Sequence, residues 1–84
     1  NFLSRKKREI QSRLLPIENA ISQLEKKKSE NESFLCDPSI LTDSGKVQTL
    51  MKELKEINQE LTILMQKWET IAEEMDRLNT KEEE

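Results

Sequence analysis

The amino-acid sequence predicts an all-α chain that folds into an antiparallel two-helix coiled-coil hairpin with a short irregular tip. The first observation is a run of apolar residues between positions 47 and 78, spaced alternately by three and four residues, which averages the coiled-coil period. The second is a weaker copy of this pattern between positions 10 and 24. The third is composition: one Gly, two Pro, no Tyr and 37% charged residues leave little material for a sheet or a thick core.

Helix one is expected at about residues 4–36. Ser4 is the expected cap for its first-turn amides. Asp37-Pro38 ends it, because the residue before a proline is pushed out of the α region. Pro16 lies inside this helix and is expected to kink it, since proline removes one backbone hydrogen bond. The expected seam residues of helix one and the tip are Ile10, Leu14, Ile17, Ile21, Leu24 and Leu35.

Residues 37–43 form the expected connector, and helix two follows at about residues 44–79. Asp43 is its expected cap, because the carboxylate accepts first-turn amides and meets the positive end of the helix dipole. Residues 80–84 are expected to fray, since three consecutive glutamates at a helix C-terminus oppose the dipole. The expected seam residues of helix two are Val47, Leu50, Leu54, Ile57, Leu61, Leu64, Trp68, Ile71, Met75 and Leu78.

The two seams fix a register for the hairpin. Pairing residues whose numbers sum to about 85 places every apolar rung of helix one opposite an apolar rung of helix two. Trp68 then faces Ile17 and is expected to be the largest core residue. The same register puts Lys28 and Asn31 opposite apolar residues, so the seam is expected to be weakest just below the tip. Two interpretations stay open: the lysine snorkels and the asparagine sets the register, or the softened seam lets the tip bend against a partner.

Charge is divided unevenly along the chain. Residues 1–36 hold eight Lys/Arg against five Asp/Glu, and residues 37–84 hold six against twelve, so the halves attract each other. Basic side chains gather at two places that are candidates for contacts with nucleic-acid phosphates, because neutralised phosphates release counterions. The tip lysines are Lys26, Lys27, Lys28, Lys46, Lys52 and Lys55, and the N-terminal basic patch is Arg5, Lys6, Lys7 and Arg8.

A blander interpretation of these charges stays open as well. The isoelectric point near 5.1 and the lack of an exposed aromatic platform are not typical of nucleic-acid-binding proteins. A charged run on a coiled coil is usually its solvated face. The register also sets the N-terminal basic patch beside Glu73, Glu74 and Asp76, which are expected to neutralise part of it.

Several classes of function are not expected from these residues. The chain has no His, one Cys and no glycine-rich loop, so the usual nucleophile-base pairs, zinc sites and phosphate-binding loops are missing. No enzyme activity, cofactor or metal is therefore expected in this domain. No apolar stretch approaches the length of a membrane span, and no signal peptide is visible. Cys36 has no internal partner for a disulfide, so a soluble domain in the cytoplasm or an equivalent reducing compartment is expected.

A set of short motifs gives the chain a family resemblance. In order they are Leu3-Ser4, Leu15-Pro16, Cys36-Asp37-Pro38, the run from Asp43 to Leu50, Lys52-Glu53-Leu54 and Lys67-Trp68-Glu69. Together they resemble the C-terminal coiled-coil domain of ABC-F ATPases of the Uup type. Ser44-Gly45 replaces that family's proline-acid pair, and Lys28 and Asn31 stand where the family usually has leucine.

The resemblance implies a longer protein. Asn1 is no initiator methionine, and the chain is expected to be the C-terminal domain of a cytoplasmic ATPase that carries two nucleotide-binding cassettes upstream, uses ATP and Mg²⁺ and acts on ribosomes. Some members of the family regulate translation or resist antibiotics, and in Uup-type members the hairpin is implicated in DNA binding and in supporting the ATPase. The resemblance therefore implies a non-catalytic arm that contacts DNA or ribosomal RNA.

Two alternatives to a nucleic-acid-binding arm remain open. In the first, the chain is a structural or protein-interaction hairpin that docks on the cassettes of its own protein or on a protein partner through Phe34, Ile40 and Leu41. In the second, helix two forms a coiled coil with another copy of itself. The internal partner seam predicts instead that the isolated domain is a monomer.

Overall fold

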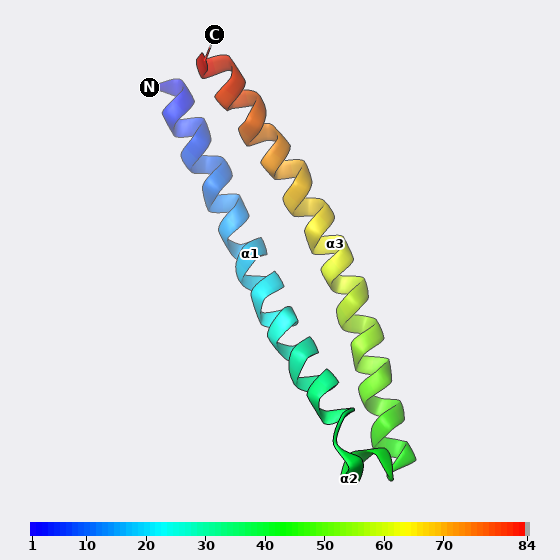
Figure 1. Ribbon diagram of the computed structural model, residues 1–84. Coiled ribbons are helices and arrows are strands. Elements are labelled where there is room, and N and C mark those ends of the chain that lie inside the picture. Colours follow the sequence, from blue (N-terminus) through cyan, green and yellow to red (C-terminus); the bar gives the residue numbers. More distant parts are fainter. Residues whose placement is uncertain (84) are drawn as a thin grey trace.

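The computed structural model describes the backbone of residues 1–83 and the side chains of residues 1–81, and its described part contains three helices. They are α1 (Phe2–Phe34), α2 (Pro38–Leu41) and α3 (Ser44–Glu83). The helices α1 and α3 run antiparallel along a rod of 61 × 15 × 14 Å, and α2 closes the end far from both termini (Figure 1). The structure confirms the expected all-α antiparallel hairpin.

Helix α1 begins two residues earlier than expected. The Oδ1 atom of Asn1 accepts the backbone N–H of Leu3 at 2.8 Å, so Asn1 is the N-cap. Ser4 lies inside the first turn, and its expected role as the cap is wrong, because the asparagine side chain already meets the first free amide. The helix continues through Pro16 and ends at Phe34, two residues before the expected end.

The connector at residues 37–43 contains a turn of helix that the sequence analysis did not anticipate. The carboxylate of Asp37 accepts two hydrogen bonds from Ser39, one from the backbone N–H at 2.9 Å and one from the side-chain hydroxyl at 2.8 Å. Pro38 fits the first turn of α2, because the missing N–H of a proline needs no partner there. The next cap follows at once: Asp43 accepts the Lys46 N–H at 3.2 Å and starts α3. The tip therefore consists of two capped helix starts in succession.

Helix α3 extends beyond its expected end. It continues to Glu83, four residues past the expected end at Asn79, and residue 84 lies outside the described residues. The expected fraying of residues 80–84 stays a prediction. The hydroxyl of Thr80 donates to the Asp76 carbonyl at 3.0 Å, and Lys81 places a positive charge near the negative end of the helix dipole. The start of α1 also lies beside this segment, so α3 has a helical neighbour along its length (Figure 1).

The core is a single row of side chains between α1 and α3. Ile10, Ile57, Leu61 and Ile71 are its most buried apolar residues, with 3 to 9% exposure. The other expected seam residues are half-buried, with the exception of Trp68. Between side chains that the structure describes, hydrogen bonds from α1 to α3 join residues 13 and 74, 18 and 68, and 31 and 53, whose numbers sum to 87, 86 and 84. These sums agree with the expected register of about 85.

The surface of the rod is mainly polar. No helix in the described part of the chain combines the length and the apolar character that a membrane crossing requires.

Candidate functional site

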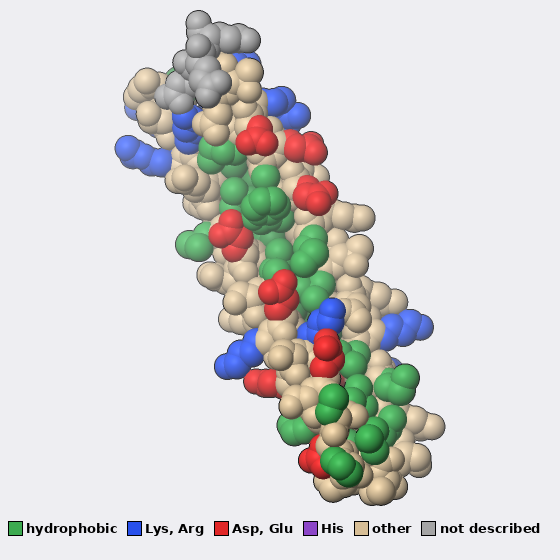
Figure 2. All heavy atoms as spheres, in the orientation of Figure 1, with side chains coloured by type: hydrophobic (Ala, Val, Ile, Leu, Met, Phe, Trp, Pro, Cys, Tyr) green, Lys and Arg blue, Asp and Glu red, His purple; other side chains and the backbone are tan. Residues whose placement is uncertain are grey.

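The tip lysines are spread along the half of the rod that ends at the tip, and they point to different sides. Lys26 lies midway between the seam residues Leu24 and Lys28, which places it on the outer side of α1. Lys52 lies midway between Leu50 and Leu54 in the same way, on the outer side of α3. Figure 2 shows basic side chains projecting from both edges of the rod near the tip. The structure therefore arranges these charges around the rod and not on one face.

Five of the six tip lysines are exposed, and Lys28, which occupies a seam position, is half-buried. Among the side chains that the structure describes, none of the six forms an ion pair within 4.0 Å. Their charges are available to an external anion, although several glutamates of both helices lie in the same half of the rod. These glutamates are Glu25, Glu30, Glu32, Glu53 and Glu56.

The N-terminal basic patch lies at the opposite end of the rod and is partly occupied by internal contacts. The Lys6 ammonium lies 3.6 Å from Glu9, and the nearby Arg13 donates to Glu74 at 3.2 Å. Lys7 is half-buried at a seam position. The Arg13–Glu74 pair is about half exposed, so it contributes only about 0.2 to 1 kcal/mol to stability. Of the two basic regions, the tip lysines are the more available to an anion.

Asn31 is the buried polar residue of the seam, with 5% exposure. Its amide Nδ2 donates to the Glu53 carboxylate at 2.9 Å, so the expected polar misfit has a partner on the facing helix. The sequence analysis did not identify Glu53 as this partner. The register contained the signal, because Glu53 directly precedes Leu54, the residue expected opposite Asn31. A satisfied polar layer of this kind favours the interpretation in which Asn31 sets the register.

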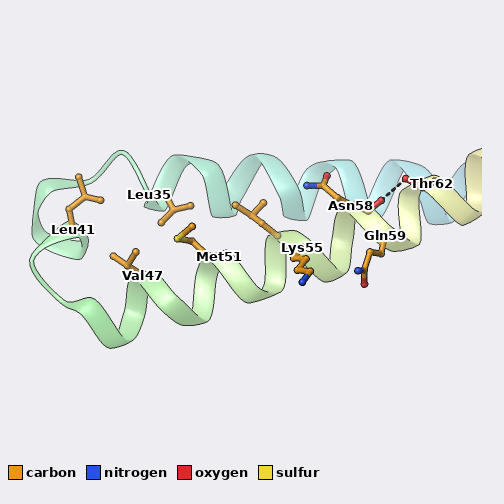
Figure 3. A pocket seen from close by; sticks show the side chains of 9 residues that line it. Leu35, Leu41, Val47, Met51, Lys55, Asn58, Gln59 and Thr62 are labelled. Atoms are coloured by element: carbon orange, nitrogen blue, oxygen red, sulfur yellow. Dashed lines mark hydrogen bonds between the residues drawn. The ribbon is translucent and has the colours of Figure 1, made fainter.

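The tip exposes apolar side chains that the hairpin core does not cover. Phe34, Leu41 and Met51 are 50%, 54% and 60% exposed, and hydrophobic side chains gather at this end of the rod (Figure 2). Leu35 and Ile40 at the same end are half-buried. Two shallow grooves lie beside these apolar residues. One contains Leu35, Leu41, Val47 and Met51 (Figure 3), and the other contains Phe34, Ile40, Lys46 and Leu50.

Trp68 lies at the edge of the seam and not inside it. Its side chain is 37% exposed, so the expectation that it is the largest core residue is wrong. A seam between only two helices has no further layer to cover a large ring, and the indole N–H of a tryptophan needs a polar partner. That partner is Glu18, whose Oε1 accepts the Nε1–H at 3.0 Å. The ring borders a shallow hollow, called here the Trp68 hollow, which is lined by Glu18, Ile21, Ser22, Glu25, Met65, Trp68 and Glu69.

The cap of α2 carries a perturbed carboxyl group. The hydroxyl and then the backbone N–H of Ser39 donate to Asp37 and lower the pKa of this exposed carboxyl below its usual range. The negative charge of Asp37 is thus part of what orders the tip.

The comparisons with known proteins agree with this architecture. The family model described as the ABC transporter C-terminal domain matches residues 3–73. The chain belongs to this family. The "Putative ATP-binding protein YdiF" of Bacillus subtilis (strain 168) is 36% identical over 59 residues, which are 70% of this chain and 9% of that protein. The chain thus spans a small part of this relative's length, and no solved structure matches it significantly.

Membership of the ABC transporter C-terminal domain family confirms the resemblance to the C-terminal domain of ABC-F-type proteins. The matched residues include α1, the tip and the part of α3 that carries Trp68. Both the tip lysines and the Trp68 hollow therefore belong to the domain that defines the family.

The residues of this domain do not fit ATP or Mg²⁺. Its one glycine, Gly45, lies in the first turn of α3, where an added Cβ would be 3.4 Å from the Asp43 carboxylate, and no glycine-rich loop is present to surround phosphates. Among the described residues, no group of three His, Cys, Asp or Glu side chains could hold a metal ion.

Proposed function

We propose that this domain is a non-catalytic arm of an ABC-F ATPase and that its tip contacts the phosphate backbone of DNA or ribosomal RNA. The observation that carries the proposal is the set of exposed tip lysines, which have no ion pair among the described side chains. Their placement around the rod suits an arm that lies between nucleic-acid segments and meets phosphates on more than one side. ATP and Mg²⁺ would bind to the cassettes of the longer protein, in the cytoplasm or an equivalent reducing compartment.

The shape of the rod favours contacts with the backbone over readout of bases. At 15 × 14 Å the rod is wider than the major groove of B-DNA, which is about 12 Å across and admits a single helix. Contacts with phosphates carry no direct sequence information, so the proposed binding is insensitive to sequence. It depends on salt, because each neutralised phosphate releases counterions.

A triple substitution of Lys27, Lys52 and Lys55 to Gln tests the proposal. We expect weaker binding to a duplex DNA and to a structured RNA, and a plot of log affinity against log salt that is less steep by about 2 to 3, because each lost phosphate contact removes about 0.9 from the slope on duplex DNA. Fluorescence anisotropy at a series of salt concentrations measures both quantities.

The matched control changes Lys67, Arg77 and Lys81 to Gln, which removes the same charge from exposed positions away from the tip. This variant is expected to keep most of the salt slope. Equal losses in the two triple variants, or a slope that the tip variant leaves unchanged, would contradict a contact made by the tip.

A second candidate function is docking on a protein through the apolar tip, either on the cassettes of the longer protein or on a separate partner. The specific observation is that Phe34, Leu41 and Met51 are at least half exposed. Substitution of Phe34 and Leu41 to Ser separates the two candidates. If the tip binds nucleic acid, this double variant keeps its salt-dependent affinity for DNA and RNA. If the tip docks on protein, the variant loses its association with the ATP-binding domains of the longer protein.

A further inference from the structure

Trp68 holds its ring at the edge of the seam, where part of it is open to solvent. It occupies a seam position of α3, yet 37% of its side chain is exposed beside Met65, which is 43% exposed. The Nε1–H donates to Glu18 at 3.0 Å, which fixes the edge of the indole and holds the ring in one orientation. The Trp68 hollow thus offers a preorganised aromatic surface with apolar neighbours, Ile21 and Met65.

The rim of the hollow is acidic. Glu18, Glu25 and Glu69 line it together with Ser22, and no Lys or Arg belongs to the lining. Among the described side chains, these three glutamates form no ion pair within 4.0 Å. Glu18 uses Oε1 for the indole, which leaves Oε2 as a further acceptor. An aromatic ring surrounded by carboxylates without a cation is complementary to a positively charged planar group.

We propose that the Trp68 hollow binds an arginine side chain presented by a basic segment of a partner protein. The guanidinium group stacks on the indole, and its N–H groups donate to the carboxylates of Glu25 and Glu69. Its aliphatic stem lies against Ile21 and Met65. Arginine fits better than lysine, because the planar guanidinium can stack and donate in two directions at once.

This contact is independent of the proposed binding of nucleic acid. The hollow carries the opposite charge from the tip lysines, so phosphates are repelled from it. Trp68 lies 13 residues beyond Lys55, which corresponds to about 20 Å along α3, and the nearer edge of the hollow, at Glu25, adjoins the tip lysine Lys26. The arm therefore has two surfaces that select partners of opposite charge.

Tryptophan fluorescence can test the proposal directly, since Trp68 is the chain's one tryptophan. The probe is a capped seven-residue peptide with three arginines, and its control is the same peptide with the uncharged isostere citrulline at those positions. We expect a saturable change in emission with the arginine peptide, with affinity at least about tenfold above that of the citrulline peptide and weakened by salt. Equal affinity of the two peptides, or no saturable change up to millimolar concentration, would overturn the proposal.

Two double variants locate the contact. Substitution of Glu25 and Glu69 to Gln is expected to weaken binding by about tenfold, because both charge-assisted hydrogen bonds lose their charge. Substitution of Glu60 and Glu73 to Gln removes the same charge from exposed positions outside the hollow and is expected to change affinity less than about twofold. Equal losses in the two variants would show general charge attraction and would overturn the assigned site.

The aromatic contribution needs a readout without tryptophan. By calorimetry, Trp68→Phe is expected to keep part of the affinity and Trp68→Leu to lose it, whereas a ring with only a structural role predicts equal affinity for both variants. Circular dichroism of the same samples checks that the helices form. The glutamate variants keep the test decisive should either Trp68 variant unfold.

Discussion

At the scale of single residues, the hairpin is specified by a few polar groups in an otherwise apolar seam. Asn31 is 5% exposed and donates to Glu53 at 2.9 Å. A buried amide of this kind stabilises less than a leucine would, but it allows one register, because in a shifted register the amide loses its acceptor.

Opposite substitutions of Asn31 test this role. We expect Asn31→Leu to raise the free energy of unfolding by about 1 kcal/mol, since an apolar side chain replaces a buried polar group and Glu53 can turn to solvent. Asn31→Asp is expected to lower it by about 1 to 3 kcal/mol at neutral pH, because two carboxylates then meet in a half-buried place. Urea denaturation measures both changes, and a stability loss in Asn31→Leu would contradict the account.

Asp37 makes the tip sensitive to acid. Its pKa is lowered in the folded state by the Ser39 hydroxyl and then by the Ser39 backbone N–H. The ionised carboxylate therefore stabilises the tip at pH values above the unfolded pKa of about 3.9, and this contribution is lost as the pH falls through the lower folded value.

Ser39→Ala removes the larger of the two causes. We expect the pKa of Asp37 to rise toward the ordinary aspartate value while staying below it, because the backbone N–H of residue 39 still donates. An NMR titration of the Asp37 carboxyl carbon in the parent chain and in the variant measures the change. A pKa of Asp37 that does not respond to the substitution would show that the hydroxyl bond is absent in solution.

At the scale of the elements, the seam of α3 could be predicted residue by residue, since a strict alternation of three and four residues leaves one face for the partner helix. Features set by side-chain competition could not be predicted. Asn1 caps α1 in place of Ser4, and Asp37 organises α2 inside the connector. The position of Trp68 also escaped prediction, because periodicity gives the direction of a residue but not whether two helices can enclose its ring. Of the two candidate surfaces, the tip lysines could be predicted from the sequence. The Trp68 hollow could be identified only in the structure, because its lining comes from both α1 and α3.

Two isoleucines of α3 test which face carries the packing energy. Ile57 is 5% exposed and Ile63 is 52% exposed. We expect Ile57→Ala to lower the free energy of unfolding by about 2 to 4 kcal/mol and Ile63→Ala by less than about 1 kcal/mol. Thermal and urea denaturation of the two variants compare the same chemical change at a buried and at an exposed position, and similar losses would contradict a single seam.

At the scale of the whole molecule, the hairpin is a rod of 61 Å whose ends differ. The start of α1 and the end of α3 lie side by side at one end, and α2 lies at the other (Figure 1). The α2 end also carries the exposed Phe34, Leu41 and Met51. The internal pairing of α1 with α3 occupies the seam that a second copy would need, so the isolated domain is expected to be a monomer. A rod of this form places the tip far from the N- and C-terminal ends of the two long helices (Figure 1).

The proposed contact between this tip and nucleic acid can be probed directly in this chain. Cys36 is the one cysteine and is exposed beside α2, so a photoactivated crosslinker attached to its thiol reports on what the tip contacts. The control carries Cys36→Ser and Gln66→Cys, which moves the crosslinker to an exposed position on α3 away from the tip. At physiological salt we predict crosslinks to a structured RNA or a duplex DNA from position 36 and few from position 66. Equal crosslinking from both positions, or none from position 36, would contradict the account.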